Sequence, residues 1–212
     1  IDLMFGIPNQ SFEDLKKDLE TILLLSPDNI SIYSLIWEEG TVFWSKLKRG
    51  ILSRIDQDLE AEMYEEIIDF LKKNGYIHYE ISNFSKKGMG GVHNLKYWRN
   101  KEFIGAGLSA AAYYGGRRYS NVRTFNKYYK FLDENIFPVD ENSIEIVDET
   151  EKEKLKNMLG LRLIEEGIEY FDDPKVEKLL SRGLLERFND GTRMRLTKTG
   201  ILLANDVFME FI

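Results

Sequence analysis

Residues 1–81 alternate between short strand-forming runs and amphipathic helical stretches, and this order limits the fold more than any other feature of the chain. Apolar residues cluster or alternate in the strand-forming runs and recur at helical spacing in the others. Ser11 is suited to cap the first helix and Gly75 to end the last. The sequence therefore predicts strands within 1–8 and at 29–35 and 76–81, with helices at 12–25, 42–48 and 56–74. Such alternation favours a largely parallel sheet, either half of a barrel or an open α/β sheet.

A different pattern follows the glycine-rich turn at residues 105–107. The spacing predicts helices at 126–135, 149–166 and 175–181, a hairpin over 184–196 turned at 189–191, and a last helix from Thr197 to Phe211. Helix, helix, hairpin and helix in this order suggest a small winged-helix-like domain. We therefore expect two domains, with residues 1–120 forming the later part of a barrel and residues 121–212 the C-terminal domain.

Composition excludes several kinds of site. The chain has no cysteine, so its residues provide no disulfide, no thiolate nucleophile and no cysteine ligand for an iron–sulfur cluster. A net charge of -7 gives no general attraction to DNA or to anionic membranes. No run reaches the roughly 18 apolar residues of a membrane span. We expect a soluble, cytoplasmic protein with no nucleic-acid partner, and a further segment before Ile1, because a chain seldom begins inside a core strand.

Polar and aromatic side chains gather between Tyr79 and Trp98. The chain has only two histidines and three tryptophans, and one of each falls in this segment. Most of the segment is predicted to be a strand end and a loop, where functional groups are exposed on a rigid scaffold. The candidate site residues here are Glu80, Asn83, His93, Asn94, Tyr97 and Trp98.

Several blocks along the chain resemble one family. They are DLMFGIPNQ at 2–10, ISIYSL at 30–35, EGT at 39–41, YEISNF at 79–84, HNLKYW at 93–98 and NVR at 121–123. In combination they are similar to the oxygen-independent coproporphyrinogen III oxidase-like radical SAM proteins, and specifically to the heme chaperone branch. The resemblance implies a radical SAM barrel whose first half, absent here, carries a CxxxCxxC loop for a 4Fe-4S cluster.

The resemblance also implies site residues. Asp2, and Gln10 after it, would bind S-adenosyl-L-methionine (SAM), since a carboxylate at the C-terminal end of a barrel strand can accept hydrogen bonds from a cofactor. The HNxxYW block is linked to heme in the chaperone branch, so His93 is the candidate ligand of heme iron. Asn94 belongs to the same block, and Tyr97 and Trp98 would pack on a porphyrin face.

Three positions depart from the family pattern. Gly91 stands where family members often have cysteine, and Val92 where a basic residue is usual. Ala111 stands where the family commonly has histidine. Two contacts to heme or iron that the family often provides are therefore missing from this chain.

Alternatives remain open beside this interpretation. The chain could be part of a coproporphyrinogen oxidase that decarboxylates propionates through a radical, or a nucleic-acid binder using the basic residues of its last hairpin. Those basic residues are Arg182, Arg187, Arg193, Arg195 and Lys198. His78, Glu80 and His93 could form a metal site, and the run 115–118 an anion site with paired arginines. A heme chaperone would need an acceptor protein, including one at a membrane, and a homodimer is left open.

Overall fold

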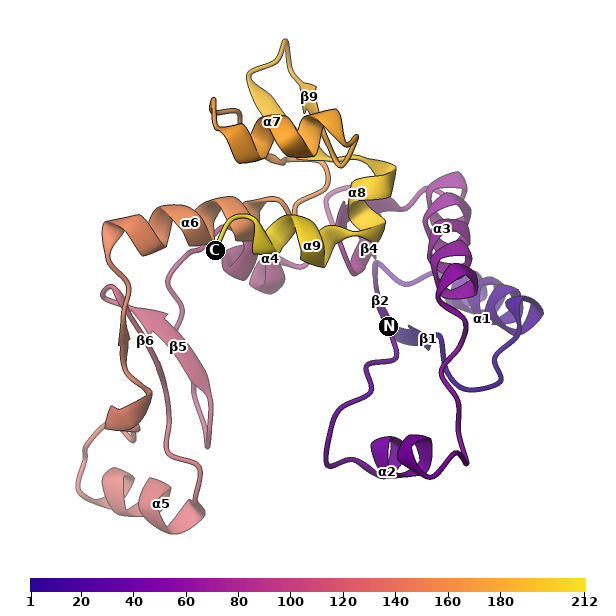
Figure 1. The fold of residues 1–212 in the computed structure, drawn as a ribbon. Coiled ribbons are helices and arrows are strands. Elements are labelled where there is room, and N and C mark those ends of the chain that lie inside the picture. The colour runs from indigo at the N-terminus through magenta and orange to yellow at the C-terminus, as the bar shows by residue number, and fades with distance from the viewer. The chain divides into compact units, whose positions relative to one another are not determined.

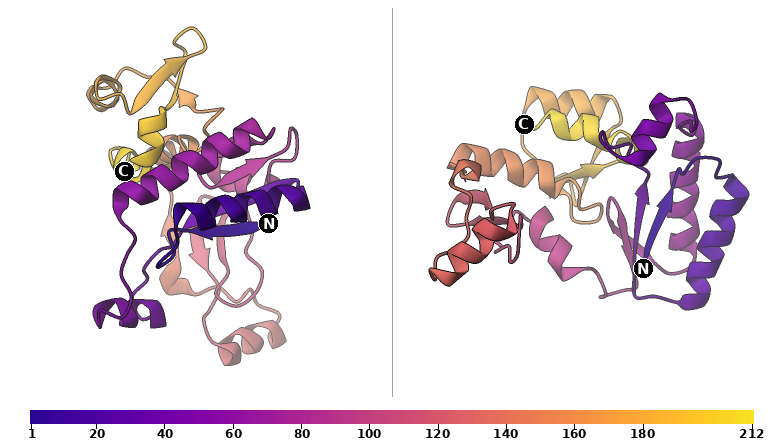
Figure 2. Two further views of the ribbon diagram at one scale, coloured as in Figure 1. Left: turned by 90° about the vertical axis from the view of Figure 1, so that its right-hand side faces the viewer. Right: turned by 90° about the horizontal axis from the view of Figure 1, so that it is seen from below.

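The computed structural model describes residues 1–212, which divide into two compact units (Figures 1 and 2). The first unit holds residues 1–91 and 163–166, and the second holds 92–162 and 167–212. This division differs from the expected boundary at residue 120. Residues 92–120 join the second unit because their hairpin pairs with a strand at residues 145–146. Residues 163–166 join the first, where the Ile164 N–H donates to the Tyr79 carbonyl at 3.2 Å.

The first unit has an α/β architecture, in agreement with the predicted fold class. Its elements are β1 (Asp2–Phe5), α1 (Phe12–Leu25), β2 (Asn29–Ser34), α2 (Val42–Lys48), α3 (Gln57–Lys73), β3 (Ile77–Glu80) and β4 (Asn83–Ser85). Each predicted helix and strand of residues 1–81 is present within one or two residues, and the first strand lies inside the predicted range 1–8. Ser11 caps α1 in a capping box, and Gly75 follows α3 with a positive φ of 85°.

The sheet of this unit is mixed, and the expectation of a largely parallel sheet is wrong. The strand order is β1-β2-β4-β3, and only β1 and β2 form a parallel pair. The chain turns back at residues 81–82, so that β4 inserts between β2 and β3 and pairs antiparallel with both. β2 and β3 still run in the same direction, as a crossover through α3 requires, but β4 separates them.

Helices α1 and α3 lie side by side over one face of this sheet (Figures 1 and 2). The helices contribute the fully buried residues Leu15, Leu19, Met63, Ile67 and Leu71, and the strands contribute Ile30, Ile32 and Phe84. Because side chains along a strand alternate between faces, burial of this apolar set commits the intervening residues to the opposite face.

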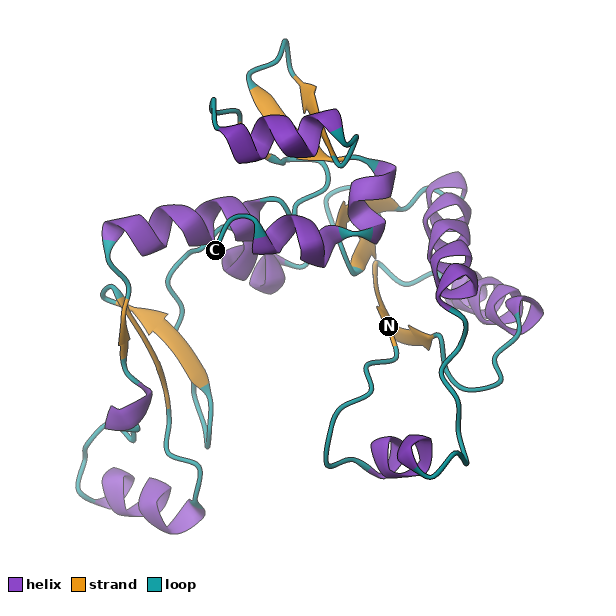
Figure 3. Ribbon diagram, in the orientation of Figure 1, coloured by secondary structure: helices purple, strands orange, loops and turns teal.

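The second unit combines short helices with two three-stranded antiparallel sheets (Figure 3). Its helices are α4 (Val92–Trp98), α5 (Phe125–Asp133), η1 (Glu141–Ser143), α6 (Glu149–Gly160), α7 (Pro174–Ser181), α8 (Lys198–Leu202) and α9 (Ala204–Met209). Its strands are β5 (Ala111–Tyr114), β6 (Arg117–Ser120), β7 (Glu145–Ile146), β8 (Ile168–Glu169), β9 (Leu185–Phe188) and β10 (Arg193–Leu196). The sheet orders are β5-β6-β7 and β8-β10-β9.

Three sequence predictions in this unit need correction. Residues 92–98 form a helix instead of a loop. The helix predicted over 149–166 ends at Gly160, which packs so closely on Ile168 that a Cβ would lie 2.6 Å from its Cγ2 atom. The last helix is broken at Leu203 into α8 and α9. The predicted order of helix, helix, hairpin and helix is present, while its description as a winged helix stays a prediction. No helix is long and apolar enough to cross a bilayer.

His78 is a buried titratable group in the core of the first unit. Its ring stacks on Phe84 at 4.3 Å, and its Nε2–H donates to the Ile81 carbonyl at 3.1 Å. The Nδ1 atom is buried without a hydrogen-bond partner. Burial disfavours the charged imidazolium and lowers the pKa of His78 from 6.5 to about 4. His78 is therefore neutral in the folded protein at neutral pH.

This lowered pKa predicts a loss of stability in acid. Below pH 6.5 the unfolded chain takes up a proton that folded His78 accepts only near pH 4. Stability is thus full above pH 6.5, and roughly 2–4 kcal/mol is lost as the pH falls toward 4. Urea unfolding followed across this range should show that His78→Gln abolishes the extra acid-side loss. His93→Gln, which changes the other, exposed histidine, should retain it; equal pH dependence in both variants would contradict the assignment.

Candidate functional site

A row of polar side chains crosses the sheet of the first unit on the face opposite α1 and α3. Strand register places Asp2 beside Ser31, Ser31 beside Asn83, and Asn83 beside Glu80, so the row spans all four strands. The Ser31 hydroxyl donates to the side-chain Oδ1 atom of Asn83 at 2.7 Å, and the Asn83 side-chain Nδ2 donates to the Glu80 carboxylate. Two of these side chains, Asn83 and Glu80, are almost completely buried. Buried polar groups at this density need partners, and here they provide them for one another.

A β-bulge between His78 and Glu80 creates this arrangement. Regular alternation would place both residues on the same face, yet His78 pairs with Phe84 and Glu80 with Asn83, which point to opposite faces. The bulge therefore separates the imidazole from the carboxylate. No group of three or more histidine, aspartate or glutamate side chains is arranged to hold a metal ion. The metal site considered for His78, Glu80 and His93 is thus not supported.

Asp2 belongs to the polar row, but it lies at a different position in its strand from the one the sequence suggested. It is the first residue of β1, so the expectation that it lies at the C-terminal end of its strand is wrong. Asp2 remains exposed, and its link to the candidate site comes from its register with Ser31.

Gln10 occupies the C-terminal edge of β1. Gly6 turns the chain there with a positive φ of 69°, and its N–H donates to the Gln10 Oε1 atom at 2.8 Å. The Gln10 side chain is buried, and its Nε2 atom has no hydrogen-bond partner. An unsatisfied buried donor costs free energy, so this amide is suited to a bound acceptor group.

Ser34 and Glu60 extend this edge, and sequence reasoning missed them. Ser34 ends β2, the parallel neighbour of β1, and its hydroxyl donates to the Glu60 carboxylate from the first turns of α3. Ser34 could have been found from the sequence, because it is the last residue of an alternating strand. Glu60 could not, since only the packing of α3 against the sheet brings its carboxylate to Ser34.

Helix α4 presents His93 at the surface of the second unit. The spacing of four residues places His93 and Tyr97 on one face of the helix, where the Tyr97 hydroxyl and His93 Nε2 lie 2.7 Å apart. The rings meet edge-on at 4.8 Å. His93 is exposed, and its Nδ1 atom has no partner within the chain. One imidazole nitrogen is therefore held in place while the other is accessible to a ligand.

Trp98 and Asn94 of the same helix are arranged differently. The Arg162 guanidinium lies 4.2 Å from the centre of the Trp98 ring and covers one of its faces. Trp98 Nε1 is buried without a hydrogen-bond partner. Trp98 therefore packs one face of its ring within the unit, and its stacking on a porphyrin stays a prediction. Asn94 is half-buried.

The positions that depart from the family pattern have clear local roles. The Gly91 N–H donates to the Tyr79 hydroxyl at 3.0 Å, and the same hydroxyl accepts from the Asn29 amide at 3.0 Å. Val92 begins α4 and is exposed. Ala111 begins β5, where its small side chain lines a cavity of the second unit.

The basic residues of the last hairpin are largely engaged within the fold. Arg187 stacks on Tyr170 at 3.6 Å and donates to the Gly191 carbonyl at 3.0 Å. Arg195 pairs with Glu186 at 2.7 Å. A nucleic-acid surface needs such side chains to be directed at phosphates, so the structure gives the nucleic-acid alternative no support.

Comparison with known proteins finds relatives along the whole chain. The chain is 35% identical over 225 residues to the Heme chaperone HemW of Lactococcus lactis subsp. lactis (strain IL1403), and 37% identical over 222 residues to the protein of that name in Bacillus subtilis (strain 168). Both matches cover 100% of the chain and 58% of the relative. It is also 37% identical over 110 residues to the mouse protein named Radical S-adenosyl methionine domain-containing protein 1, mitochondrial, covering 52% of the chain and 25% of that protein.

The structural comparison agrees on the fold. Coproporphyrinogen III oxidase (HemN) from Escherichia coli, described as a radical SAM enzyme, matches with a TM-score of 0.74 at 19% identity, over 100% of this chain and 54% of the other. No family model matches the chain. The chain spans little more than half the length of the heme chaperones it matches. These relationships show that the chain belongs to the coproporphyrinogen III oxidase-like radical SAM family and corresponds to a C-terminal portion of its heme chaperone relatives.

Proposed function

We propose that the protein containing this chain is a heme chaperone, which binds heme and passes it to acceptor proteins. The observation that carries the proposal is His93, an exposed imidazole on α4 within a chain related over its whole length to heme chaperones. Heme is the cargo of such a protein and must be bound reversibly. An exposed position at the surface of one unit suits a ligand that has to be delivered.

The surroundings of His93 support iron binding by its imidazole. Histidines that bind metals usually have their second ring nitrogen held by a hydrogen bond, which fixes the tautomer and the ring orientation. The Tyr97 hydroxyl oxygen would accept from the His93 Nε2–H, which leaves the lone pair of Nδ1 for the iron. Imidazole is a common axial ligand of heme iron. Asn94 and Tyr97 are proposed as neighbouring heme contacts.

We propose that the complete protein also binds SAM and a 4Fe-4S cluster, as a member of this family. The cluster ligands cannot come from this chain, because it has no cysteine. Gln10 fits the cofactor, since its buried Nε2 donor has no partner within the chain. Asp2, which is exposed, would accept hydrogen bonds from the polar groups of SAM. The bound SAM would contribute to assembly or dimerisation instead of turnover.

We propose that the protein is cytoplasmic and that the acceptor of its heme can lie at a membrane. Conversion of coproporphyrinogen III by the reconstituted full-length protein would favour the oxidase alternative over the chaperone.

The heme proposal predicts a specific loss on substitution of His93. In a spectroscopic titration of the full-length protein with ferric heme, His93→Ala should abolish the Soret shift or weaken binding by at least about tenfold, because the iron loses its ligand. Tyr97→Phe keeps the ring but removes the hydrogen bond to His93, and should weaken binding less. Lys96→Ala, on an exposed neighbour in the same helix, is the matched control. Unchanged heme affinity in His93→Ala would rule out this ligand.

The SAM proposal predicts a defect when the Gln10 donor is removed. Gln10→Glu keeps an oxygen for the Gly6 N–H but replaces the Nε2 donor with an acceptor, so SAM affinity measured by equilibrium dialysis should fall by about tenfold or more. Gln57→Glu makes the same chemical change at an exposed position and should have no effect. Thermal unfolding of both variants checks that the fold is intact. Equal SAM affinity in a folded Gln10→Glu protein would exclude Gln10 from the cofactor site.

A further inference from the structure

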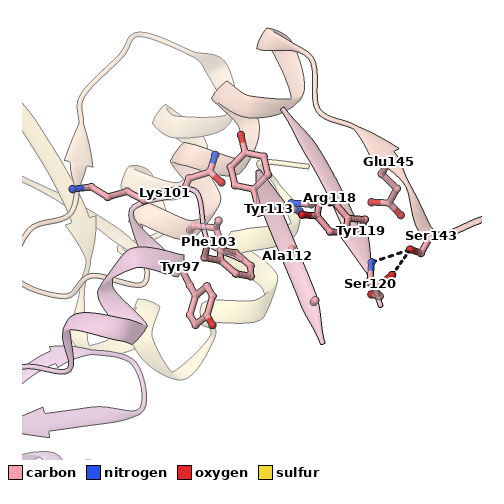
Figure 4. Close-up of a pocket in the computed structure, with 13 residues that line it drawn as sticks. Tyr97, Lys101, Phe103, Ala112, Tyr113, Arg118, Tyr119, Ser120, Ser143 and Glu145 are labelled. Carbon is pink, nitrogen blue, oxygen red and sulfur yellow. Dashed lines mark hydrogen bonds between the residues drawn. The ribbon is translucent and has the colours of Figure 1, made fainter. Parts of the chain in front are cut away.

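A cavity of about 290 Å³ opens within the second unit, next to the helix that carries His93 (Figure 4). Four segments line it: the end of α4 with the loop after it, the β5–β6 hairpin, the stretch from η1 to β7, and α6 through Leu159. Tyr97 connects the cavity to His93, because its ring lines the cavity while its hydroxyl contacts the imidazole. The cavity and the proposed iron ligand therefore share one residue.

Aromatic rings and small side chains give the cavity its shape. Tyr97 and Phe103 meet edge-on at 4.5 Å on one side, and the ring of Tyr113 lines another (Figure 4). Ala111 and Ala112 end at Cβ and leave the space between these rings open. Aromatic walls around an open volume suit a flat unsaturated ligand, which gains contact area with little loss of conformational freedom.

Positive charge is concentrated in the same cavity. Arg118 is half-buried, with its guanidinium 5.5 Å from the centre of the Tyr113 ring, and Lys101 lies at the exposed rim. Neither side chain forms an ion pair within the chain, although Glu145 lines the same cavity directly across from Arg118 in the register of β6 and β7. One guanidinium and one ammonium against one carboxylate leave a net positive charge. A partly buried, unpaired arginine is well suited to bind a carboxylate through two parallel hydrogen bonds.

Arg117, the neighbour of Arg118 in the sequence, does not line the cavity. Arg117 and Arg118 follow the turn made by Gly115 and Gly116, both of which have positive φ. Successive residues of β6 point to opposite faces, so Arg118 lies across from buried Tyr113 and Arg117 across from exposed Tyr114. The paired arginine forks considered for this run are therefore wrong, and only Arg118 faces the cavity.

We propose that this cavity binds the propionate-bearing edge of the porphyrin, with Arg118 as the main partner of a propionate carboxylate and Lys101 supporting it at the rim. This proposal rests on the proposed heme function and specifies which part of the heme the protein recognises. His93 binds the iron, and the cavity orients the macrocycle through its acidic edge. Tyr97 links both contacts and limits how far apart they can lie.

The test compares two porphyrins that differ only in the carboxylates. The full-length protein is titrated with ferric heme and with its dimethyl ester, in which both propionates are uncharged. The wild-type protein should bind heme about tenfold more tightly than the ester, a typical factor for a charge-assisted hydrogen bond. Arg118→Ala should remove this preference by weakening heme binding while leaving the ester unchanged. Arg117→Ala removes the same charge from the opposite face and should retain the preference.

Two further variants keep the test independent of folding defects. Glu145→Gln removes the one acidic group of the cavity and should tighten heme binding, an effect that damage to the fold would not produce. Ala111→Phe fills the cavity without a change of charge and should weaken both porphyrins. If wild-type protein binds heme and the ester equally, or if Arg118→Ala and Arg117→Ala behave alike, the cavity does not bind propionate while the heme function stands. A wild-type protein that binds neither porphyrin would overturn both proposals.

Discussion

Burial of one face of the sheet under α1 and α3 is the constraint on which the first unit depends. Residues such as Ile30, Ile32 and Phe84 must face the helices, because only there can they leave water. Strand alternation then assigns Ser31 and Asn83 to the opposite face, and register adds Asp2. The polar row is therefore a consequence of hydrophobic burial. It would not exist if the strands were shifted by one residue.

The β-bulge in β3 modifies this constraint at one point. It allows His78 to stay in the apolar layer, neutral and stacked on Phe84, while Glu80 joins the polar row two residues later. A regular strand would place an imidazole and a carboxylate on the same face, and one of them would be misplaced. The bulge thus separates a structural histidine from a buried carboxylate of the polar row.

The second unit combines contacts within one helix with contacts between segments that are distant in the sequence. The HNLKYW block forms one helix, whose spacing brings Tyr97 to His93, while Trp98 turns toward Arg162. The β5–β6 hairpin then adds Arg118 to the cavity that Tyr97 also lines. Two adjacent aromatic residues of one motif consequently have different roles, since one lines an open cavity and the other packs under a guanidinium.

The sequence by itself determined the α/β class, the bounds of α1, β2, α2 and α3, the hairpin at 189–191 and the family, because these follow from local periodicity, capping residues and the order of motifs. Tertiary structure alone decided the insertion of β4, the helical state of residues 92–98 and the early end of α6 at Gly160. It also decided that Asp2 lies with Ser31, that Ser34 meets Glu60, and that Arg118 and Arg117 face apart. These features arise from pairing between distant segments, and no local pattern specifies which partner a strand or side chain will meet.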